Sequence, residues 1–379
     1  MKRVMIVAGE VSGDQHAARL VRGLKAVRGD VEFFGIGGEA LRREGVRTEV
    51  DVRDMAVVGF FEVLRRYCFF RRVFHRMVAR LAAEKPDALL LVDYPGFNLR
   101  LAEQAHARGI PVLYYVSPQV WAWHRSRIPK MAKILDLLMV IFPFEVDVFK
   151  GTGLKTVFVG HPLVESTRRT WAAPAAALPW PAGARRVGLL PGSRRQEIER
   201  VLPAMLDAAR ELRRRDPETA FLIPAASEAI RMQIDAQLAA RPAAERAAIG
   251  VVTGQMREVA RQARAAMVCS GTATVETALM QCPMIVVYRM APLTYWFGKR
   301  IIRVPWLGMV NLIANRTLCP EFIQAAASPE AMADALAPLI ADTPARQAQL
   351  AGLAEVARAL EGPGGAPTAG QMVAEALGP

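Results

Sequence analysis

Short apolar runs alternate with longer segments of mixed polarity along most of the chain. In the longer segments apolar residues recur three and four positions apart, as in residues 17–27 and 71–83, and this period predicts amphipathic helices. The short runs predict buried strands at residues 4–8, 31–35, 88–92, 112–116, 137–141 and 157–159. Strands that alternate with helices imply right-handed crossovers and a parallel, doubly wound sheet.

A second series of the same kind follows a stretch rich in alanine and proline. This stretch, residues 170–186, lacks a regular period and is typical of an interdomain linker. The second series predicts strands at residues 187–190, 220–223, 250–252, 266–269 and 284–287. We therefore expect an α/β fold of two doubly wound domains, residues 1–169 and 187–345, whose strand ends face a shared cleft.

Composition and charge narrow the class of partner. With 379 residues, 52% of them hydrophobic, the chain can bury two ordinary cores. The formal net charge of +13 indicates an anionic partner, which could be nucleic acid, a membrane surface or a phosphorylated substrate. The sequence has no basic tail and no interleaved aromatic and basic residues of the kind that nucleic-acid modules use. Nucleic acid is therefore the least favoured of the three.

The four cysteines and the hydrophobic runs indicate the redox compartment of the protein and its relation to a membrane. Cys68, Cys269, Cys282 and Cys319 lack metal-ligand spacing, and we interpret them as small hydrophobes in a reducing compartment. The first apolar run is interrupted at Glu10, so it predicts a strand rather than a signal peptide. No stretch approaches the ~18 apolar residues that a spanning helix requires, so we expect any membrane contact to be peripheral.

The stretch VGLLPGSRRQEIER, residues 187–200, passes from an apolar run through a glycine turn into a helical pattern. The N–H groups at a helix start and a nearby guanidinium both favour an anion, which makes Gly192, Ser193 and Arg194 a candidate phosphate site. The alternative is a plain helix cap, because Ser193 followed by Glu197 is close to a capping arrangement. This stretch alone supports the two interpretations equally.

A second turn of this kind occurs in CSGTATVETAL, residues 269–279. Ser270, Gly271, Thr272 and Thr274 lie where a strand gives way to a helix, and Glu276 lies in its first turns. Taken alone, this second turn is more simply explained as a helix cap. Together the two turns favour a nucleoside diphosphate, because such a ligand needs separate contacts for its phosphates and its ribose.

The first strand ends in AGEVSGDQHAARL. Gly9 and Gly13 permit a tight turn, and Ser12 and Asp14 can cap the helix that follows. The spacing fits neither the dinucleotide fingerprint nor a P-loop. Glu10 and Asp14 would repel a phosphate, so an acceptor with hydroxyl groups suits this turn better, although capping accounts for at least half of the pattern.

The stretch LLLVDYPGFNLRLA puts Asp93 at the end of an apolar strand, with Asn98 just beyond the turn. A carboxylate that leaves such a strand is partly desolvated, which raises its pKa and suits a general base. An aspartate at a strand end often only caps the next turn. We favour the catalytic interpretation, because the turn after Asp93 needs no second cap.

Residues 55–77 combine paired aromatic residues with clustered arginines. This composition is typical of an interfacial segment attracted to anionic lipid, although a helix packed on the sheet would show similar residues. We predict membrane docking by Phe60, Phe61, Phe69, Phe70, Arg65, Arg66, Arg71 and Arg72.

Eight motifs follow one another along the chain: AGEVSGDQHA, GIGGEAL, VDYPGFN, SPQVWAW, GHPLVE, LLPGSRRQEIER, SGTATVETAL and VNLIANRTLCPEFIQ. In order and spacing they resemble the lipid-A-disaccharide synthases, glycosyltransferases of the GT-B architecture, over essentially the whole chain. The resemblance implies two Rossmann-like domains facing across a cleft, residues 1–169 for the acceptor and membrane and residues 187–345 for the UDP-sugar. It also implies that residues 346–379 return to the first domain or are exchanged in a homodimer.

The implied reaction transfers 2,3-diacylglucosamine from its UDP derivative to 2,3-diacylglucosamine 1-phosphate, with inversion, giving lipid A disaccharide 1-phosphate and UDP. By this resemblance Asp93 would take the proton of the acceptor 6-hydroxyl, and Glu10, Ser12 and Asp14 would position the acceptor or assist Asp93. The implied UDP contacts are Gly192, Ser193, Arg194, Ser270, Gly271, Thr272, Thr274, Glu276 and Asn311. No cofactor and no metal are implied, because arginine and amide dipoles can stabilise the departing UDP.

The resemblance further implies a cytoplasmic protein bound peripherally to the anionic inner face of the inner membrane, without a nucleic-acid partner. Two other classes of function remain open. One is another UDP-sugar enzyme of the same architecture, such as a 2-epimerase or the transferase of peptidoglycan synthesis. The other is a non-catalytic lipid- or nucleotide-binding protein. A 2-epimerase would release free sugar from UDP-N-acetylglucosamine without lipid, and a binding protein would tolerate replacement of Asp93.

Overall fold

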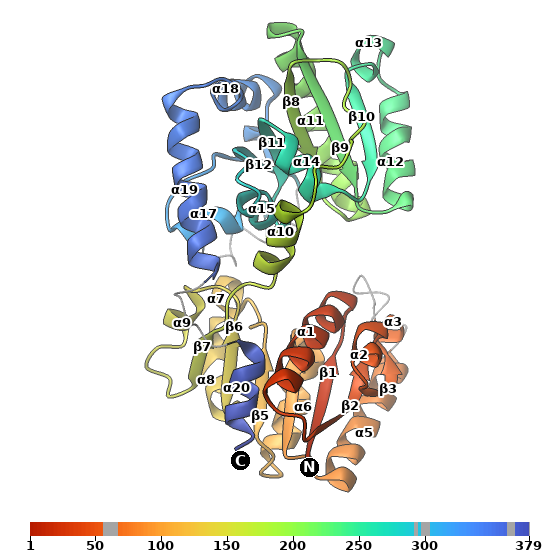
Figure 1. Ribbon diagram of the computed structural model, residues 1–379, viewed down its shortest axis with the longest axis vertical. Helices are drawn as coiled ribbons and strands as arrows, with labels where there is room; N and C mark the ends of the chain where they lie inside the picture. Colours follow the sequence, from red (N-terminus) through yellow and green to blue (C-terminus); the bar gives the residue numbers. More distant parts are fainter. Residues whose placement is uncertain (56–66, 292–294, 297–303, 362–367, 379) are drawn as a thin grey trace. The chain divides into compact units, whose positions relative to one another are not determined.

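The computed structural model describes the chain except for residues 56–66, 292–294, 297–303, 362–367 and 379. The chain forms two compact units (Figure 1). Unit 1 comprises Met1–Pro162 and Gly362–Pro379, and unit 2 comprises Leu163–Glu361. The chain therefore passes from unit 1 to unit 2 and back again.

Unit 1 is built on a seven-stranded parallel sheet with the order β3-β2-β1-β4-β5-β6-β7. The interior strand β4 is buried along its whole length, as expected when helices cover both faces of a parallel sheet. The strands are β1 (Lys2–Ala8), β2 (Val31–Gly37), β3 (Arg47–Asp51), β4 (Ala88–Val92), β5 (Val112–Tyr115), β6 (Leu137–Val140) and β7 (Lys155–Phe158).

The helices of unit 1 include one from the far end of the sequence. Helix α20 packs on α1, and the two backbones approach so closely that a Cβ on Gly370 would lie 2.5 Å from the Leu24 nitrogen. The described helices of this unit are α1 (Val11–Val27), α2 (Glu39–Arg43), α3 (Val52–Met55), α5 (Tyr67–Glu84), α6 (Pro95–His106), α7 (Val120–Trp123), η1 (Arg125–Arg127), α8 (Ile128–Ile134), α9 (Glu145–Val148) and α20 (Ala369–Ala376).

Unit 2 has a six-stranded parallel sheet with the order β10-β9-β8-β11-β12-β13. Its strands are β8 (Arg185–Leu190), β9 (Thr219–Ala225), β10 (Ile249–Thr253), β11 (Ala265–Cys269), β12 (Met284–Tyr288) and β13 (Glu321–Ile323). Its described helices are α10 (Leu163–Ala172), α11 (Arg195–Arg215), α12 (Glu228–Ala239), α13 (Ala243–Arg246), α14 (Met256–Gln262), α15 (Thr272–Leu279), α17 (Met309–Ala314), η2 (Gln324–Ala326), α18 (Pro329–Ile340) and α19 (Pro344–Glu361).

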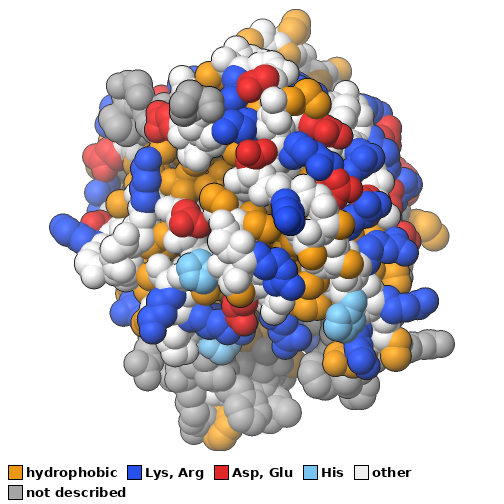
Figure 2. All heavy atoms as spheres, turned by 90° about the horizontal axis from the view of Figure 1, so that it is seen from below, with side chains coloured by type: hydrophobic (Ala, Val, Ile, Leu, Met, Phe, Trp, Pro, Cys, Tyr) orange, Lys and Arg blue, Asp and Glu red, His pale blue; other side chains and the backbone are white. Residues whose placement is uncertain are grey.

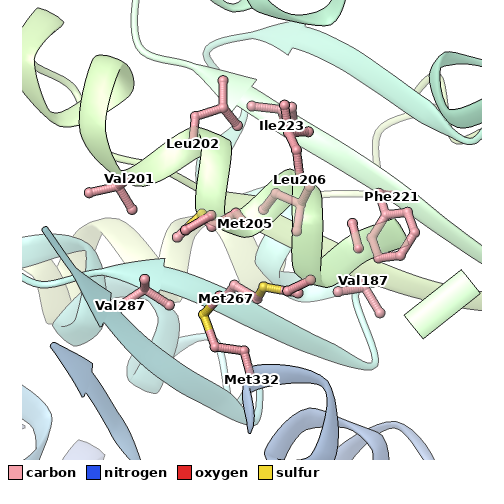
Figure 3. Packing of buried hydrophobic residues seen from close by; sticks show 14 of the residues in the cluster. Val187, Val201, Leu202, Met205, Leu206, Phe221, Ile223, Met267, Val287 and Met332 are labelled. Atoms are coloured by element: carbon pink, nitrogen blue, oxygen red, sulfur yellow. The ribbon is translucent and has the colours of Figure 1, made fainter. Parts of the chain in front are cut away.

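The core of unit 2 is formed where α11 and α18 pack on the sheet. Figure 3 shows Met205 and Leu206 of α11 together with Val187 and Met267 of the sheet, and Met332 of α18 beside them. All five are buried in one hydrophobic cluster. The long amphipathic helix α11 is thereby fixed directly after the turn that follows β8.

In both sheets the first strand along the chain lies inside the sheet, with later strands on either side of it. In unit 1 β1 lies between β2 and β4, and in unit 2 β8 lies between β9 and β11. The strand order reverses at these points, and open parallel sheets bind ligands outside the carboxyl ends of the strands there. Each unit therefore has one switch point, beside β1 and β4 or beside β8 and β11.

The predicted α/β fold with two doubly wound parallel sheets is confirmed, and every predicted apolar run overlaps a strand. The apolar runs do not predict β3 and β13, which are edge strands. In β3 only Val50 is buried, and β13 has no buried residue. An edge strand needs no continuous apolar run, because one of its sides lacks a neighbour.

The segment expected to be a linker, residues 170–186, lies in unit 2. Trp180 Nε1 donates a hydrogen bond to Gln262 at 3.0 Å, and the guanidinium of Arg261 lies 5.2 Å from the centre of the Trp171 ring. The contacts of the chain divide it between Pro162 and Leu163, whereas the sequence expectation puts the end of the first domain at residue 169. Helix α10 consequently belongs to unit 2.

Candidate active site

Asp93 lies directly after β4, beside the switch point of unit 1. Asp93 and Tyr94 both have a left-handed backbone, each with φ of 50°, which non-glycine residues keep only when their surroundings hold them. The Asp93 carbonyl accepts hydrogen bonds from the Tyr114 hydroxyl at 2.6 Å and from Asn98 Nδ2 at 2.7 Å. Asn98 is fully buried. Two buried side chains therefore fix the backbone from which the Asp93 carboxyl projects.

The carboxyl group of Asp93 forms no ion pair within the described part of the chain. Burial raises the pKa of Asp93, the negative charge of Glu10 raises it further, and the Tyr94 backbone N–H partly offsets both. Glu10 itself is exposed at the start of α1. A half-buried carboxyl with a raised pKa at a strand end has the properties of a general base.

The turn between β1 and α1 packs against the turn after β4. A Cβ on Gly9 would lie 2.2 Å from the Tyr94 ring, so only glycine lets the ring take this position. The Tyr94 hydroxyl donates to the Met55 carbonyl at 3.3 Å. Glu10 and the exposed Ser12 therefore lie at the same edge of the sheet as Asp93, as the catalytic prediction requires.

Asp14 lies in the same turn, but its carboxylate binds backbone N–H groups of another segment and so stabilises the fold. It is almost fully buried and accepts hydrogen bonds from the backbone N–H groups of Gly38 at 2.6 Å, Ala40 at 2.9 Å and Leu41 at 3.3 Å. These are unpaired donors at the start of α2, which a carboxylate stabilises. Asp14 thus joins the AGEVSGD and GIGGEAL turns, and we omit it from the acid–base chemistry proposed below.

Sequence reasoning missed a buried acid in unit 1. Glu145 accepts hydrogen bonds from Trp121 Nε1 at 3.0 Å and from the Phe142 N–H at 3.2 Å. Burial raises the pKa of Glu145 to about 7, and these hydrogen bonds partly offset it. The signal was present in the sequence, because a glutamate interrupts the aromatic and aliphatic residues 141–146. Glu145 thus anchors the SPQVWAW motif through Trp121 of α7.

Two histidines of unit 1 also escaped the sequence analysis. Burial lowers the pKa of His161 to about 3, with a contribution from His16. Burial also lowers the pKa of His16 to about 4, with a contribution from Arg19. Both imidazoles are therefore neutral near pH 7. The Nδ1 of His16 has no hydrogen-bond partner among the described residues.

In unit 2 the turn after β8 carries an internal anion. One carboxylate oxygen of Glu197 accepts hydrogen bonds from the backbone N–H groups of Ser193 at 2.9 Å and Arg194 at 3.1 Å. The other lies 3.1 Å from Nη1 of the exposed Arg194. Gly192 has φ of 110°, which favours glycine. The Glu197 carboxylate therefore caps the helix and is also the anion that the N–H groups of this turn bind, so the structure agrees with both interpretations.

The turn after β11 lies next to it, because β8 and β11 are paired strands. Ser270 Oγ donates to the Leu307 carbonyl at 2.8 Å, and Thr274 Oγ1 donates to the Gly271 carbonyl at 2.8 Å. Thr274 is fully buried, whereas Thr272 is exposed. Of the predicted UDP contacts in this turn, Thr272 and the Gly271 backbone are therefore accessible, while Thr274 stabilises the turn from within.

Glu276 of α15 is half-buried and paired with an arginine. Its Oε1 lies 3.1 Å from Nε of Arg257, which also donates from Nη1 to the Ser166 carbonyl at 3.0 Å. Burial raises the pKa of Glu276, and Arg257 partly offsets this. A carboxylate held in this way keeps lone pairs for further donors. The ribose contact predicted for Glu276 fits this geometry and stays a prediction.

Asn311 of α17 is fully buried and all of its side-chain hydrogen-bonding groups are engaged. Nδ2 donates to the Cys319 carbonyl and to Glu321, both at 2.8 Å. Oδ1 accepts from the N–H groups of Leu318 at 2.9 Å and Cys319 at 2.8 Å. A direct contact with UDP would need an exchange of these bonds. The donor-site role predicted for Asn311 is therefore more consistent with holding the loop before β13.

The membrane-docking prediction falls partly outside the described residues, since these do not include Phe60, Phe61, Arg65 and Arg66. In α5 the arginines Arg71 and Arg72 are exposed and the two phenylalanines, Phe69 and Phe70, are half-buried. Figure 2 shows one face of the molecule, on which Lys and Arg side chains are interspersed with acidic and hydrophobic ones. On this face the positive charge is distributed rather than gathered into one patch.

The described part of the chain contains no helix long and apolar enough to cross a membrane. Among the same residues no group of three or more His, Cys, Asp or Glu side chains is placed to hold a metal ion. Cys269, Cys282 and Cys319 are buried, as expected, whereas Cys68 is exposed.

Solved structures with a similar fold include enzymes of nucleotide sugars. UDP-GlcNAc 2-epimerase from Neisseria meningitidis bound to UDP-GlcNAc matches with a TM-score of 0.59 and 11% identity, covering 100% of this chain and 99% of that chain. Acinetobacter baumannii MurG matches with a TM-score of 0.57 and 14% identity, with the same coverage. Such identities show the fold alone. Two Rossmann-like units of this topology define the GT-B architecture of glycosyltransferases.

Sequence comparison gives the family within this class. The family model described as lipid-A-disaccharide synthetase matches residues 4–363. Lipid-A-disaccharide synthase from Geobacter sulfurreducens is 40% identical over 378 residues, covering 99% of this chain and 97% of the relative. The synthase from Anaeromyxobacter sp. (strain K) is 42% identical over 367 residues, covering 96% and 94%. The chain belongs to the lipid-A-disaccharide synthase family of glycosyltransferases, which confirms the resemblance seen in the eight motifs.

Proposed function

We propose that the protein condenses UDP-2,3-diacylglucosamine with 2,3-diacylglucosamine 1-phosphate and inverts the anomeric centre. The products are lipid A disaccharide 1-phosphate and UDP. Family membership supports the two substrates. The observation that carries the chemistry is the Asp93 carboxyl, whose pKa burial and Glu10 raise at the switch point of unit 1. Such a group takes a proton readily from an attacking hydroxyl.

The transfer is a single in-line displacement. The acceptor 6-hydroxyl oxygen forms a bond with the anomeric carbon while its proton passes to Asp93. The bond from the anomeric carbon to the β-phosphate oxygen breaks, and its electron pair stays on the departing UDP. Glu10 keeps the proton affinity of Asp93 high, and Ser12 offers a hydroxyl to the acceptor at the same edge of the sheet.

The donor lies at the switch point of unit 2 in this proposal. The Gly192, Ser193 and Arg194 turn and the neighbouring Ser270, Gly271 and Thr272 turn face the pyrophosphate, and Glu276 accepts hydrogen bonds from the ribose. Helix starts and a guanidinium stabilise the charge that develops on the leaving group. Because Glu197 already occupies two of these N–H groups, the phosphate displaces it or binds beside it.

The protein works at the anionic inner face of the inner membrane, where a peripheral contact brings it to its two-tailed substrates. The doubled phenylalanines and neighbouring arginines of residues 55–77 support this contact. We expect Phe60→Asp combined with Phe61→Asp to abolish binding to anionic vesicles in a co-sedimentation assay. Vesicle binding that stays at the level of the unchanged protein would contradict the docking role. Neutral vesicles serve as the control.

A homodimer that exchanges its C-terminal segment would replace the packing of α20 on its own α1 by the same packing on a second copy. Light scattering of the full chain measures the mass that distinguishes the two arrangements. A monomer of 41.5 kDa would retain the packing of α20 within one chain.

The decisive experiment for the reaction is turnover of the two substrates in detergent micelles, followed by mass spectrometry, with and without EDTA. We expect the disaccharide 1-phosphate under both conditions. Folded protein that yields no disaccharide would overturn the proposal. Free sugar released from UDP-N-acetylglucosamine without any lipid would assign 2-epimerase chemistry to the same fold instead. Product that disappears with EDTA would keep the reaction and assign the leaving-group charge to a metal.

A further inference from the structure

A cavity in unit 2 is lined by two arginines. Its volume is about 430 Å³. It lies beyond β12 and β13, on the side of the sheet where the turns after β8 and β11 also lie, because all these strands are parallel. None of the residues proposed above to contact UDP lines it. The lining residues are Arg200, Arg289, Met290, Ala291, Gln324 and Ala325.

Neither guanidinium has a carboxylate partner among the described residues. Arg194 and Arg195, at the start of the same helix as Arg200, pair with Glu197 and Glu199. Arg200 makes neither an ion pair nor a hydrogen bond to a described residue.

Arg289 donates from Nη2 to the Ala327 carbonyl at 2.7 Å, while its buried Nε has no partner within the described part of the chain. A buried, unpaired donor on the half-buried Arg289 carries a desolvation cost. A bound anion would remove that cost. Together with Arg200, which has no described carboxylate partner, Arg289 indicates a ligand with more than one negative oxygen.

The groups around the end of β12 show that the positive charge of the cavity lies next to the turn after β8. Burial raises the pKa of Tyr288, Cys269 and Glu197 raise it further, and Arg194 and Arg200 lower it. These side chains therefore surround one strand end. The charge of Arg194 is offset by Glu197, so the positive charge that no described carboxylate offsets is that of the cavity.

We propose that Arg200 and Arg289 bind the diphosphate of the nucleotide donor. The proposal rests on the donor function proposed above and extends it to Arg200, the last residue of the LLPGSRRQEIER motif, and to Arg289, directly after β12, neither of which is among the expected UDP contacts. Guanidinium groups present forked donors that match phosphate oxygens. When the bond between the anomeric carbon and the β-phosphate oxygen breaks, its electron pair stays on that oxygen, and the two cations stabilise the charge.

The test compares Arg200→Met, Arg289→Met and the double variant with the unchanged full chain. Calorimetry measures the binding of UDP, inorganic pyrophosphate and uridine. We expect each substitution to lower the affinity for UDP and for pyrophosphate about 10-fold or more, since hydrogen bonds to charged groups are at stake. Uridine carries no phosphate, so its affinity stays unchanged.

Arg214→Met is the matched control, because Arg214 lies at the other end of α11 and pairs with Glu211. It should leave the binding of all three ligands unchanged. If Arg289→Met fails to fold, Arg200→Met decides alone, because Arg200 makes no hydrogen bond to the described fold. Urea denaturation establishes that each variant is folded.

Folded double variant that binds UDP within about twofold of the unchanged protein would overturn the role of the two arginines and leave the donor function standing. If the unchanged protein binds pyrophosphate but not UDP, the donor function is overturned. Arg200 and Arg289 then form an anion site that does not bind a nucleotide. Binding of neither ligand to the unchanged protein would overturn both.

Discussion

The switch points of the two units share a topology and differ in charge. The first six strands of the order β3-β2-β1-β4-β5-β6-β7 correspond to β10-β9-β8-β11-β12-β13, so corresponding turns occupy corresponding positions in each sheet. In unit 1 these turns carry Glu10 and Asp93, with no cation paired to Asp93 among the described residues. In unit 2 the same edge carries Arg194, Arg200 and Arg289. The topology provides the position, and the turn residues determine the chemistry.

The difference fits the two ends of the displacement reaction proposed above. A carboxyl whose pKa is raised by burial and by a second carboxylate holds a proton strongly, which suits the attacking hydroxyl. Guanidinium groups and helix-start N–H groups stabilise negative charge, which suits the leaving diphosphate. Changes confined to one unit should therefore affect one half of the chemistry and spare the other.

The largest expected effect is that of Asp93→Asn, which keeps the size of the side chain and removes the proposed base. We expect turnover to fall about 100-fold or more, while UDP affinity stays unchanged because the donor residues belong to unit 2. Initial rates by mass spectrometry and calorimetry with UDP measure the two properties. Asp87→Asn, at the opposite end of the same strand, is the control. Turnover of Asp93→Asn near the unchanged rate would exclude Asp93 as the base.

The next effect concerns the support of that carboxyl rather than the carboxyl itself. Asn98→Leu keeps the side-chain size and removes the hydrogen bonds to the Asp93 and Val92 carbonyls. We expect a loss of about 2 kcal/mol in the free energy of unfolding, measured by urea denaturation, together with slower turnover. Gln104→Leu on the same helix should change stability little. An equal loss in both variants would mean that the turn after β4 needs no such support.

A smaller effect is expected on the pH dependence. The active form of Asp93 is deprotonated, so the rate falls as the pH falls through its raised pKa. Glu10→Gln removes a negative neighbour and lowers that pKa, so the acid limb should move to lower pH. Rate profiles of the unchanged protein, Glu10→Gln and the control Glu39→Gln measure this. A movement to higher pH would contradict the coupling of the two carboxyls.

The smallest effect is expected in unit 2. Glu197→Gln removes the internal negative charge beside Arg194 and leaves an acceptor for the cap. UDP affinity should rise about two- to fivefold, because an exposed ion pair is weak. Glu199→Gln, which frees Arg195 one turn away, should leave UDP affinity unchanged. If Glu197→Gln binds UDP more weakly, Glu197 supports the turn and does not compete with the ligand.

The apolar pattern was sufficient for the interior of both sheets. Strands such as β4 and β11 are buried along their whole length, and this burial leaves a continuous apolar run in the sequence. Edge strand β3 has charged residues at both ends and leaves no such run. The apolar runs therefore predict the interior strands around each switch point. The edge strands, and so the width of each sheet, depend on contacts between segments far apart in the sequence.

The sequence also does not distinguish candidate residues that face a ligand from those that stabilise the fold. A carboxylate in a glycine-rich turn can face a ligand or the backbone, and the local sequence is the same for both. Asp93 has no ion pair with any described residue, whereas Asp14 is bound to three backbone N–H groups, which belong to a segment more than twenty residues away. The motifs gave no reason to select Arg200, the last residue of LLPGSRRQEIER, or Arg289, because the two come from a helix and a strand end that only the fold brings together.

The packing of α20 on α1 has a consequence for synthesis. The second element of unit 1 to leave the ribosome packs against its last helix, and all of unit 2 is translated between them. Until Ala376 has been made, α1 keeps an uncovered surface at Gly23 that fits only the glycine of the distant helix. All of unit 2 is thus translated before unit 1 is complete, because unit 1 still lacks α20 at that stage.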